Sequence, residues 1–309
     1  MSMDISPLLK MLVFPGGLTL IALGLLYEYI DRKLVARFQN RVGPRVLQPL
    51  ADTIKLLAKE EVIPAGVIPL FFVSLPIIAM AGALTAGLYI PLAGFAPSFS
   101  LPGDLIITVF LLGLLTICIG LAGANTADRF SLLGATRTLT QLFSYEAPFL
   151  LALLCPAILA DSWQISIVDT SVTGHVWLAL PLFIGFFVAV IGLMGKLELA
   201  PFDAPEAESE IVAGALTEYS GRGLALFRLG KDVELVIGIT LVSAFYLGGL
   251  SNPLEFLLKT LGLLVVVAAL QALFARLRID QVVGLWWRIG ALLALLQLLI
   301  VVILKGVIL

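Results

Sequence analysis

Eight stretches of this 309-residue chain are apolar enough, and nearly all long enough, to cross a lipid bilayer as helices. The hydrocarbon core of a bilayer is about 30 Å thick, and a helix needs about 20 apolar residues to cross it. The mean hydropathy of +1.09 and the 60% of hydrophobic residues exceed what the surface of a soluble domain tolerates. The sequence therefore predicts an all-α, polytopic membrane protein with eight transmembrane helices. The expected spans cover residues 12–30, 67–90, 105–124, 139–160, 176–196, 233–249, 254–275 and 286–304.

We expect one membrane domain over residues 1–309, with its two longest loops at 31–66 and 197–232. The first apolar stretch follows Lys10 without a small-residue cleavage signal, which favours a retained span over a signal peptide. Of the 19 Lys and Arg residues, 16 lie in or beside the first, third, fifth and seventh loops. Because cytoplasmic loops carry the excess of positive charge, we expect these loops in the cytoplasm and both termini outside the cell membrane.

The first long loop has two distinct parts. Its second part places Leu47, Leu50, Ile54 and Leu57 at helical spacing, which predicts an amphipathic helix lying along the membrane interface. Its first part is basic, and snorkelling toward lipid headgroups explains that charge as well as a docking function does. The basic residues are Arg32, Lys33, Arg37, Arg41 and Arg45. The third loop, around Arg137, is expected only to turn the chain.

The second long loop concentrates negative charge beside the membrane. Its segment ELAPFDAPEAESE holds five carboxylates in thirteen residues, and Glu218 follows. Carboxylates crowded at a low-dielectric boundary bind protons more readily, so some of them are expected to titrate near neutral pH. This pattern indicates a protein that moves protons. The loop carboxylates are Glu198, Asp203, Glu206, Glu208, Glu210 and Glu218.

Local signals in this loop predict a short helix. Asp203 is a suitable N-cap, Pro205 would lie in the first turn, and Glu206 follows three residues on. Asp203, Glu206 and Glu210 would then share one face. The alternative is a solvated acidic loop that pairs with Arg222 and Arg228. The apolar residues on both sides of the acidic run favour a segment folded back against the helix bundle.

Two further carboxylates lie inside expected spans. Glu146 stands beside Pro148, at a depth where a charge costs about 2.5–3.5 kcal/mol on insertion scales, so it is expected to face the protein interior. A protonated Glu146 in a structural hydrogen bond is the alternative. Glu234 is the deepest of the group Lys231, Asp232 and Glu234, and is expected to join an internal polar path.

The chain offers no redox centre of its own. Cys118 and Cys155 are solitary residues in separate apolar stretches, and His175 is the single histidine. The sequence contains no iron–sulfur or zinc spacing, no phosphate-binding or dinucleotide fingerprint, and no nucleophile with an evident base. No basic tract with interleaved aromatic residues indicates nucleic-acid binding. We therefore expect no cofactor, metal or catalytic residue in this chain, and electron transfer in partner subunits.

Three segments resemble the H subunit family of respiratory complex I, called subunit 1 in mitochondria, and the eight-span layout matches that family along nearly the whole chain. They are EYIDRKLVARFQNRVGP from Glu28, LQPLADTIKLLAKE from Leu47, and ELAPFDAPEAESEIVAGALTEYSG from Glu198. Two details are more similar to the membrane subunits of energy-converting nickel-iron hydrogenases and their archaeal relatives. Arg45 and Val46 follow Pro44 directly, without a second Asn-Arg-Val-Gly-Pro-like element, and TEYSGRGLALFRLGKDVELV begins at Thr217.

The resemblance implies a connector between a peripheral electron-transfer arm and an ion-pumping membrane arm. It implies three partners: a homologue of the nickel-iron hydrogenase large subunit, a small iron–sulfur subunit, and antiporter-like membrane subunits. The nickel-iron centre and the clusters would belong to those partners. The docking surface would comprise residues 32–57 and 198–228. Glu146 and the six loop carboxylates would open a proton path reaching Glu234, driven by movement of the loop.

Two alternatives remain open on the sequence alone. One is the H subunit of an NADH:quinone oxidoreductase, in which the first loop forms part of a quinone cavity. The other is a stand-alone proton-coupled transporter with Glu146 as its coupling site.

Overall fold

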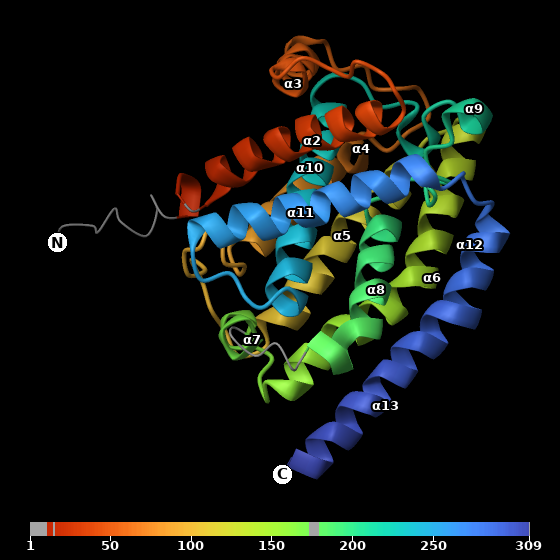
Figure 1. Cartoon of the computed structure of the whole chain (residues 1–309). Coiled ribbons are helices and arrows are strands. Elements are labelled where there is room, and N and C mark those ends of the chain that lie inside the picture. Colours follow the sequence, from red (N-terminus) through yellow and green to blue (C-terminus); the bar gives the residue numbers. More distant parts are fainter. Residues whose placement is uncertain (1–10, 15, 173–178, 309) are drawn as a thin grey trace.

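The computed structural model describes residues 11–14, 16–172 and 179–308, which form helices joined by loops (Figure 1). The only β pairing among these residues is one isolated bridge between Leu92 and Phe95. The predicted all-α class is therefore confirmed for this part of the chain. The elements are α2 (Gly17–Phe38), α3 (Gln48–Ala58), α4 (Pro69–Gly87), α5 (Asp104–Ala124), α6 (Arg129–Leu159), α7 (Ile165–Val172), α8 (Ala179–Lys196), α9 (Glu208–Ile211), η2 (Gly214–Leu216), α10 (Gly221–Tyr246), α11 (Pro253–Leu273), α12 (Ile279–Leu285), η3 (Trp286–Gly290) and α13 (Ala291–Ile308).

Within the described ranges, five helical segments are long and apolar enough to cross a membrane. They are Pro69–Gly87, Asp104–Ala124, Arg129–Leu159, Pro253–Leu273 and Ile279–Gly306. The spans expected at 12–30, 176–196 and 233–249 also coincide with helices, namely α2, α8 and α10. Charged residues interrupt the apolar run of α2 and α10. The apolar part of α8, Pro181–Lys196, is shorter than each of the five segments named above. The count of eight transmembrane helices therefore stays a prediction.

Helix α10 lies at the centre of the bundle. Every residue from Val233 to Tyr246 is buried, and the helix packs against α2, α3, α4, α8 and α11. A helix that is apolar on all sides belongs in the core of a bundle. Glu234 is therefore carried into the interior.

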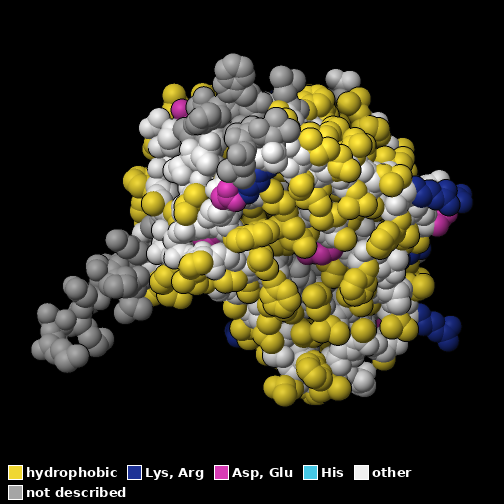
Figure 2. Space-filling view, turned by 90° about the horizontal axis from the view of Figure 1, so that it is seen from below, with side chains coloured by type: hydrophobic (Ala, Val, Ile, Leu, Met, Phe, Trp, Pro, Cys, Tyr) yellow, Lys and Arg dark blue, Asp and Glu magenta, His cyan; other side chains and the backbone are white. Residues whose placement is uncertain are grey.

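The outer surface of the bundle is largely apolar. Leu70 of α4, Leu258 of α11 and Leu292 of α13 are all strongly exposed. The face shown in Figure 2 is dominated by hydrophobic side chains, with few charged groups. Such a surface suits lipid and not water, in agreement with the composition.

The two long loops meet at one end of the molecule. Helices α3 and α9 lie at the same end in Figure 1, and α7 lies at the opposite end. The predicted amphipathic helix forms as α3, and Leu47, Leu50, Ile54 and Leu57 are exposed along it. Exposed apolar side chains of the first long loop thus lie at the same end as the second long loop.

Helix α6 begins ten residues before the span predicted at 139–160. Asp128 caps it by accepting a hydrogen bond from the Ser131 backbone N–H at 2.9 Å. The expectation that this region only turns the chain was wrong, because Arg137 lies on the helix. Pro148 is accommodated without ending α6.

Gly134 provides a test of how closely η2 packs against α6. A Cβ atom added at Gly134 would lie 2.2 Å from the Ala215 backbone nitrogen. Gly134→Ala should cost about 1–3 kcal/mol of stability, because backbone atoms must shift. Gly262→Ala on α11 is the matched control, because a Cβ there meets nothing within 4 Å. Thermal unfolding of the purified proteins measures the stability of both variants. Equal unfolding temperatures would contradict the packing described.

Candidate functional site

Inside the bundle, one lysine lies between two carboxylates. Lys196, at the end of α8, has a fully buried side chain. Its Nζ atom lies 3.7 Å from Glu146 Oε2 on α6 and 3.7 Å from Glu234 Oε1 on α10. The same Nζ lies 5.7 Å from the centroid of the Tyr145 ring. Three helices thus bring one lysine and two glutamates together; the Glu234 side chain is 1% exposed and the Glu146 side chain 30%.

Small residues make this convergence possible. An added Cβ at Gly192 of α8 would lie 2.7 Å from the Phe149 side chain of α6, so α8 approaches α6 closely. At Gly113 of α5, the corresponding Cβ would lie 3.3 Å from Glu146 Oε1. The Gln141 side-chain amide then donates to the carbonyls of Gly195 and Phe202, each at 2.8 Å. These contacts fix the end of α8 and the loop that follows it.

A second lysine joins α10 to the acidic loop. Lys231 Nζ donates to Glu198 Oε2 at 2.6 Å and to Glu206 Oε1 at 2.5 Å. Burial raises the pKa of Glu198, and the Lys231 ammonium opposes that shift. Lys231 lowers the pKa of Glu206. Although burial opposes its charge, the two carboxylates together raise the pKa of Lys231, so its ammonium form is favoured.

These six residues form two ion-paired groups, one around Lys231 and one around Lys196, which together we call the acid–lysine chain. Its members are Glu206, Lys231, Glu198, Glu234, Lys196 and Glu146. Glu234 follows Lys231 by three residues on α10 and interacts electrostatically with both lysines. The exposed fraction of the side chain falls from 51% at Glu206 to 4% at Glu198 and 1% at Glu234. From Glu206 to Glu234 the chain therefore leads from the surface of the loop into the core, whereas Glu146 at its far end is 30% exposed.

The inner part of the chain is polar but incompletely hydrogen-bonded. Among the described residues, both Glu234 carboxylate oxygens, Lys196 Nζ and the Tyr145 hydroxyl are buried without a hydrogen-bond partner. Thr240 Oγ1 lies buried on the same helix as Glu234 and is also unpartnered within the described residues. Buried polar atoms normally find partners, in protein or in bound water. Such an interior suits ordered water.

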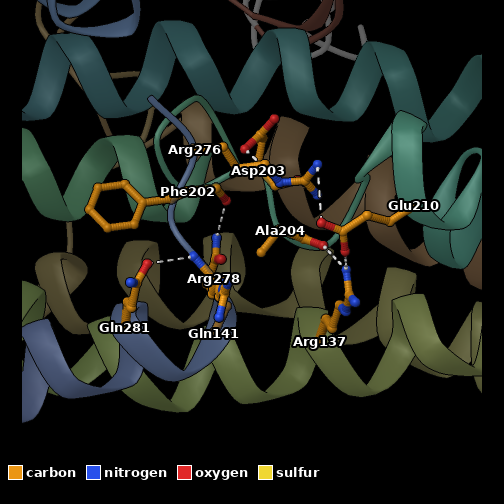
Figure 3. A network of polar contacts seen from close by, with 9 residues as sticks. All are labelled: Arg137, Gln141, Phe202, Asp203, Ala204, Glu210, Arg276, Arg278 and Gln281. Atoms are coloured by element: carbon orange, nitrogen blue, oxygen red, sulfur yellow. Dashed lines mark hydrogen bonds and ion pairs between the residues drawn. The ribbon is translucent and has the colours of Figure 1, made fainter. Parts of the chain in front are cut away.

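Two arginines hold the acidic loop against the bundle (Figure 3). Arg137 of α6 donates to Glu210 at 2.7 Å. Arg276, in the linker between α11 and α12, places Nε 3.3 Å from Asp203 Oδ1 and NH1 4.0 Å from Glu210. Arg137 lowers the pKa of Glu210, whereas burial raises the pKa of Asp203 against the influence of Arg276. The loop is thus fixed by ion pairs to two separate elements.

The prediction of a helix that starts at Asp203 was wrong. The structure has a turn there, closed by the Ala207 N–H donating to the Asp203 carbonyl at 3.1 Å. Only the four-residue α9 follows, starting at Glu208. Asp203 pairs with Arg276 and does not cap a helix. Asp203 and Glu210 therefore face Arg276, and Glu206 faces Lys231, so the three do not share one face.

The loop is folded onto the bundle, as its apolar residues predicted. Phe202 and Ile211 are buried. Gly214 adopts a left-handed φ of +56°, and a Cβ there would lie 2.0 Å from the Pro205 carbonyl oxygen. The alternative of a loop paired with Arg222 and Arg228 was wrong for the described residues, whose ion pairs use Arg137, Arg276 and Lys231 instead.

The remaining predicted residues lie outside this network. Glu218 is half-buried and has no ion pair among the described residues, whereas the Glu208 side chain and His175 lie outside them. Arg32 pairs with Glu28 of the same helix and lies 3.8 Å from Asp52 of α3, and Lys33 donates to the Pro44 carbonyl at 3.3 Å. These two residues therefore hold the first loop together. The other predicted basic residues are exposed; they are Arg37, Arg41, Arg45, Arg222 and Arg228.

Both cysteines are packed within the helix bundle. Cys118 and Cys155 are free and buried, and burial in packed helices accounts for both. Among the described residues, no group of three or more His, Cys, Asp or Glu side chains could hold a metal ion.

Sequence reasoning missed the functional place of Lys196, Lys231, Arg137 and Arg276. Lys196 ends an apolar run, where a lysine usually reaches toward lipid headgroups. Its one distinguishing signal is that a glutamate follows two residues later. The contacts of Arg137 and Arg276 join segments more than 60 residues apart, and no local pattern identifies them.

Lys231 can be tested by substitution. Lys231→Met leaves the buried Glu198 without its cation and should cost about 3–5 kcal/mol of stability. The double variant Lys231→Met/Glu198→Gln should recover most of that loss, because no unpaired charge remains. Lys59→Met, at an exposed position at the end of α3, should change stability little. Chemical unfolding, followed by tryptophan fluorescence, measures the free energy of unfolding of the three variants and of the unmodified protein.

The Lys231→Met variant should also respond to pH. Without the ammonium, burial keeps the folded pKa of Glu198 above its unfolded value of about 4.3. Folding then takes up a proton, so the loss of stability should shrink as the pH falls toward that unfolded value. A loss that is constant from pH 8 to pH 5 would contradict the assignment.

Known proteins are similar to this chain in sequence. The profile of the family described as NADH dehydrogenase matches residues 9–302. The H subunit of the NADH-quinone oxidoreductase of Dehalococcoides mccartyi (strain 195) is 34% identical over 304 residues, covering 95% of this chain and 85% of that protein. NADH-quinone oxidoreductase subunit 8 of Thermus thermophilus is 35% identical over 308 residues, covering 91% of this chain and 84% of that protein.

A solved structure has the same fold. One chain of the membrane-bound sulfane sulfur reductase, an archaeal respiratory membrane complex, superposes with a TM-score of 0.85. The match covers 96% of this chain and 100% of the other at 24% identity, and therefore establishes similarity of fold alone.

Proposed function

This chain belongs to the NADH dehydrogenase family, and on that basis we propose that it is the connector subunit of a complex I-like, energy-converting oxidoreductase in the cell membrane. In this role it docks a peripheral electron-transfer arm and couples electron transfer to ion translocation. The observation that carries the proposal is the acid–lysine chain, which leads from an exposed loop to the buried Glu234 and on to the half-buried Glu146.

Charge balance explains how the inner part of the chain can hold a proton. With Glu146 and Glu234 both ionised, their site with Lys196 carries a net charge of −1; one bound proton makes it neutral. A low-dielectric interior disfavours uncompensated charge. Lys196 is equally distant from both carboxylates, so a small displacement of its ammonium changes which carboxylate is paired and which can bind the proton.

The acidic loop connects this site to a docked partner. Arg137 and Arg276 fix one side of the loop, and Glu206 on the other side shares Lys231 with Glu198. A partner that moves the loop would draw Glu206 away from Lys231 and change the charge balance at Glu198. Glu234 interacts electrostatically with both Lys231 and Glu198, so the change reaches the inner site. Protons would pass from Glu206 through Glu198 and Glu234 to Glu146.

The docking surface is the end of the molecule at which the two long loops meet. Arg41 and Arg45 are exposed there, beside the exposed apolar residues Leu47 and Leu50. Aromatic, apolar and arginine side chains together are typical of protein interfaces. Docking of the peripheral arm would cover these groups.

We propose a nickel-iron hydrogenase-type peripheral arm. The direct passage from Pro44 to Arg45 and the segment starting at Thr217 support this assignment. The partners would then be a homologue of the hydrogenase large subunit, a small iron–sulfur subunit and antiporter-like membrane subunits. The nickel-iron centre and the clusters would belong to the first two. A quinone-reducing complex is the second candidate, favoured by relatives that are 33–35% identical and are named as subunits of NADH-quinone oxidoreductases.

The proton path can be tested in membrane vesicles. Glu146→Gln and Glu206→Gln should each lower the number of protons moved per electron transferred by more than half, while electron transfer continues. Glutamine keeps the shape of the side chain but binds no proton at this site. Glu60→Gln, at an exposed position after α3, is the control and should leave the ratio unchanged. Unchanged ratios in both variants would contradict the proposed route.

The type of peripheral arm requires a separate test. The complex should be purified gently through a tag on this chain. Elemental analysis of that complex should then detect nickel and enough iron for several iron–sulfur clusters. Flavin with bound quinone would instead support the second candidate. A single active polypeptide without either would contradict the connector role.

A further inference from the structure

An apolar cavity of about 500 Å³ opens beside α8, and no member of the acid–lysine chain lines it. Every lining residue is apolar, including Val190 and Met194 of α8, Val266 and Leu270 of α11, and Phe202 of the acidic loop. Its size falls in the range of about 300–1,000 Å³ that is typical of ligand pockets. The cavity is therefore large enough for a flexible apolar ligand.

The cavity lies between α8 on one side and α11, the linker at 274–278 and α12 on the other. Helix α11 packs against α2 and α10, whereas α13 packs against α6 and α8. Figure 1 shows the two helices diverging from the linker at 274–278. Phe187, Val266 and Phe274 line the cavity and are each 45–57% exposed, so the cavity opens on the apolar outer surface.

One end of the cavity meets a polar pocket. Leu277 lines both the cavity and a second pocket of about 290 Å³, which also contains Arg137, Glu210, Arg276, Arg278 and Asp280. Arg137 and Arg276 are paired with Glu210 and Asp203. Arg278 and Asp280 are exposed, and neither has an ion pair among the described residues. Figure 3 places Arg278 beside this network.

We propose that the cavity and the polar pocket together bind one phospholipid with a zwitterionic, primary-amine headgroup, of the phosphatidylethanolamine class. One acyl chain fills the cavity, the phosphate contacts the Arg278 guanidinium, and the ammonium contacts the Asp280 carboxylate. Guanidinium groups bind phosphate oxygens in a two-point geometry, and carboxylates accept hydrogen bonds from a primary ammonium. The pair of opposite charges at the end of an apolar cavity matches this ligand.

A transmembrane helix of another subunit fits the cavity poorly. A helix about 10 Å wide occupies roughly 400 Å³ per 5.4 Å turn, so the cavity would hold little more than one turn. A flexible acyl chain can follow the space between α8 and α11 along its length. A lipid quinone would fill the apolar part but would leave Arg278 and Asp280 without partners.

Photo-crosslinking of the whole purified complex tests this site. The probe is phosphatidylethanolamine with a photoreactive group on one acyl chain, reconstituted into nanodiscs, and the labelled peptides are identified by mass spectrometry. We expect labelling within 186–202 and 266–277. Val266→Trp should reduce it about tenfold by blocking the opening. Val265→Trp is the control, because Val265 is similarly exposed but does not line the cavity.

Headgroup variants complete the test. Arg278→Gln and Asp280→Asn should each weaken labelling about tenfold through loss of one charge-assisted contact, and Arg288→Gln, at an exposed position outside both pockets, should not. Phosphatidylglycerol and phosphatidylcholine probes with the same acyl chains should label more weakly. Four results would overturn the proposal: equal labelling by all three lipids, equal labelling of the two Trp variants, preferential labelling by a photoreactive quinone, or crosslinks from these positions only to another subunit.

Discussion

The ion pairs that Lys196 makes in the bundle interior impose the strongest constraint on this structure. A buried ammonium is strongly disfavoured unless anions compensate it, and two buried carboxylates are equally disfavoured without a cation. Glu146, Lys196 and Glu234 come from α6, α8 and α10, so their mutual compensation requires those helices to converge at one level. The small residues Gly113 and Gly192 provide the space. The polar interior is thus a constraint on the packing as well as a candidate site.

The acidic loop extends the same principle to the surface. Lys231 pairs Glu198, which is buried, with Glu206, which is half-exposed. The other carboxylates of the loop are held by Arg137 and Arg276 from elements distant in sequence. Movement of the loop therefore changes ion pairs and not only solvent exposure. This coupling of a docking segment to buried charge is what the proposed function requires.

Sequence patterns predicted the parts of this arrangement that depend on local composition. Apolar runs identified the helices, and carboxylates inside those runs identified the group around Lys196, in which Glu234 is buried and Glu146 half-buried. The helix expected at Asp203 failed because its carboxylate pairs with Arg276, 73 residues away, instead of capping. Lys196 was missed because a lysine at the end of an apolar run has the same pattern whether it faces headgroups or the core. The contacts of Arg137 and Arg276 depend on tertiary packing that no single segment encodes.

The central claim is that buried carboxylates of this chain change protonation when the docked electron-transfer arm is reduced. Infrared difference spectroscopy of the whole complex, with electrochemical reduction as the trigger, observes the carbonyl stretch of a protonated carboxylic acid directly. The account predicts a carboxylic-acid band that appears or shifts on reduction and that is lost in Glu234→Gln or Glu146→Gln. A spectrum without such a band, or a band that persists unchanged in both variants, would contradict it.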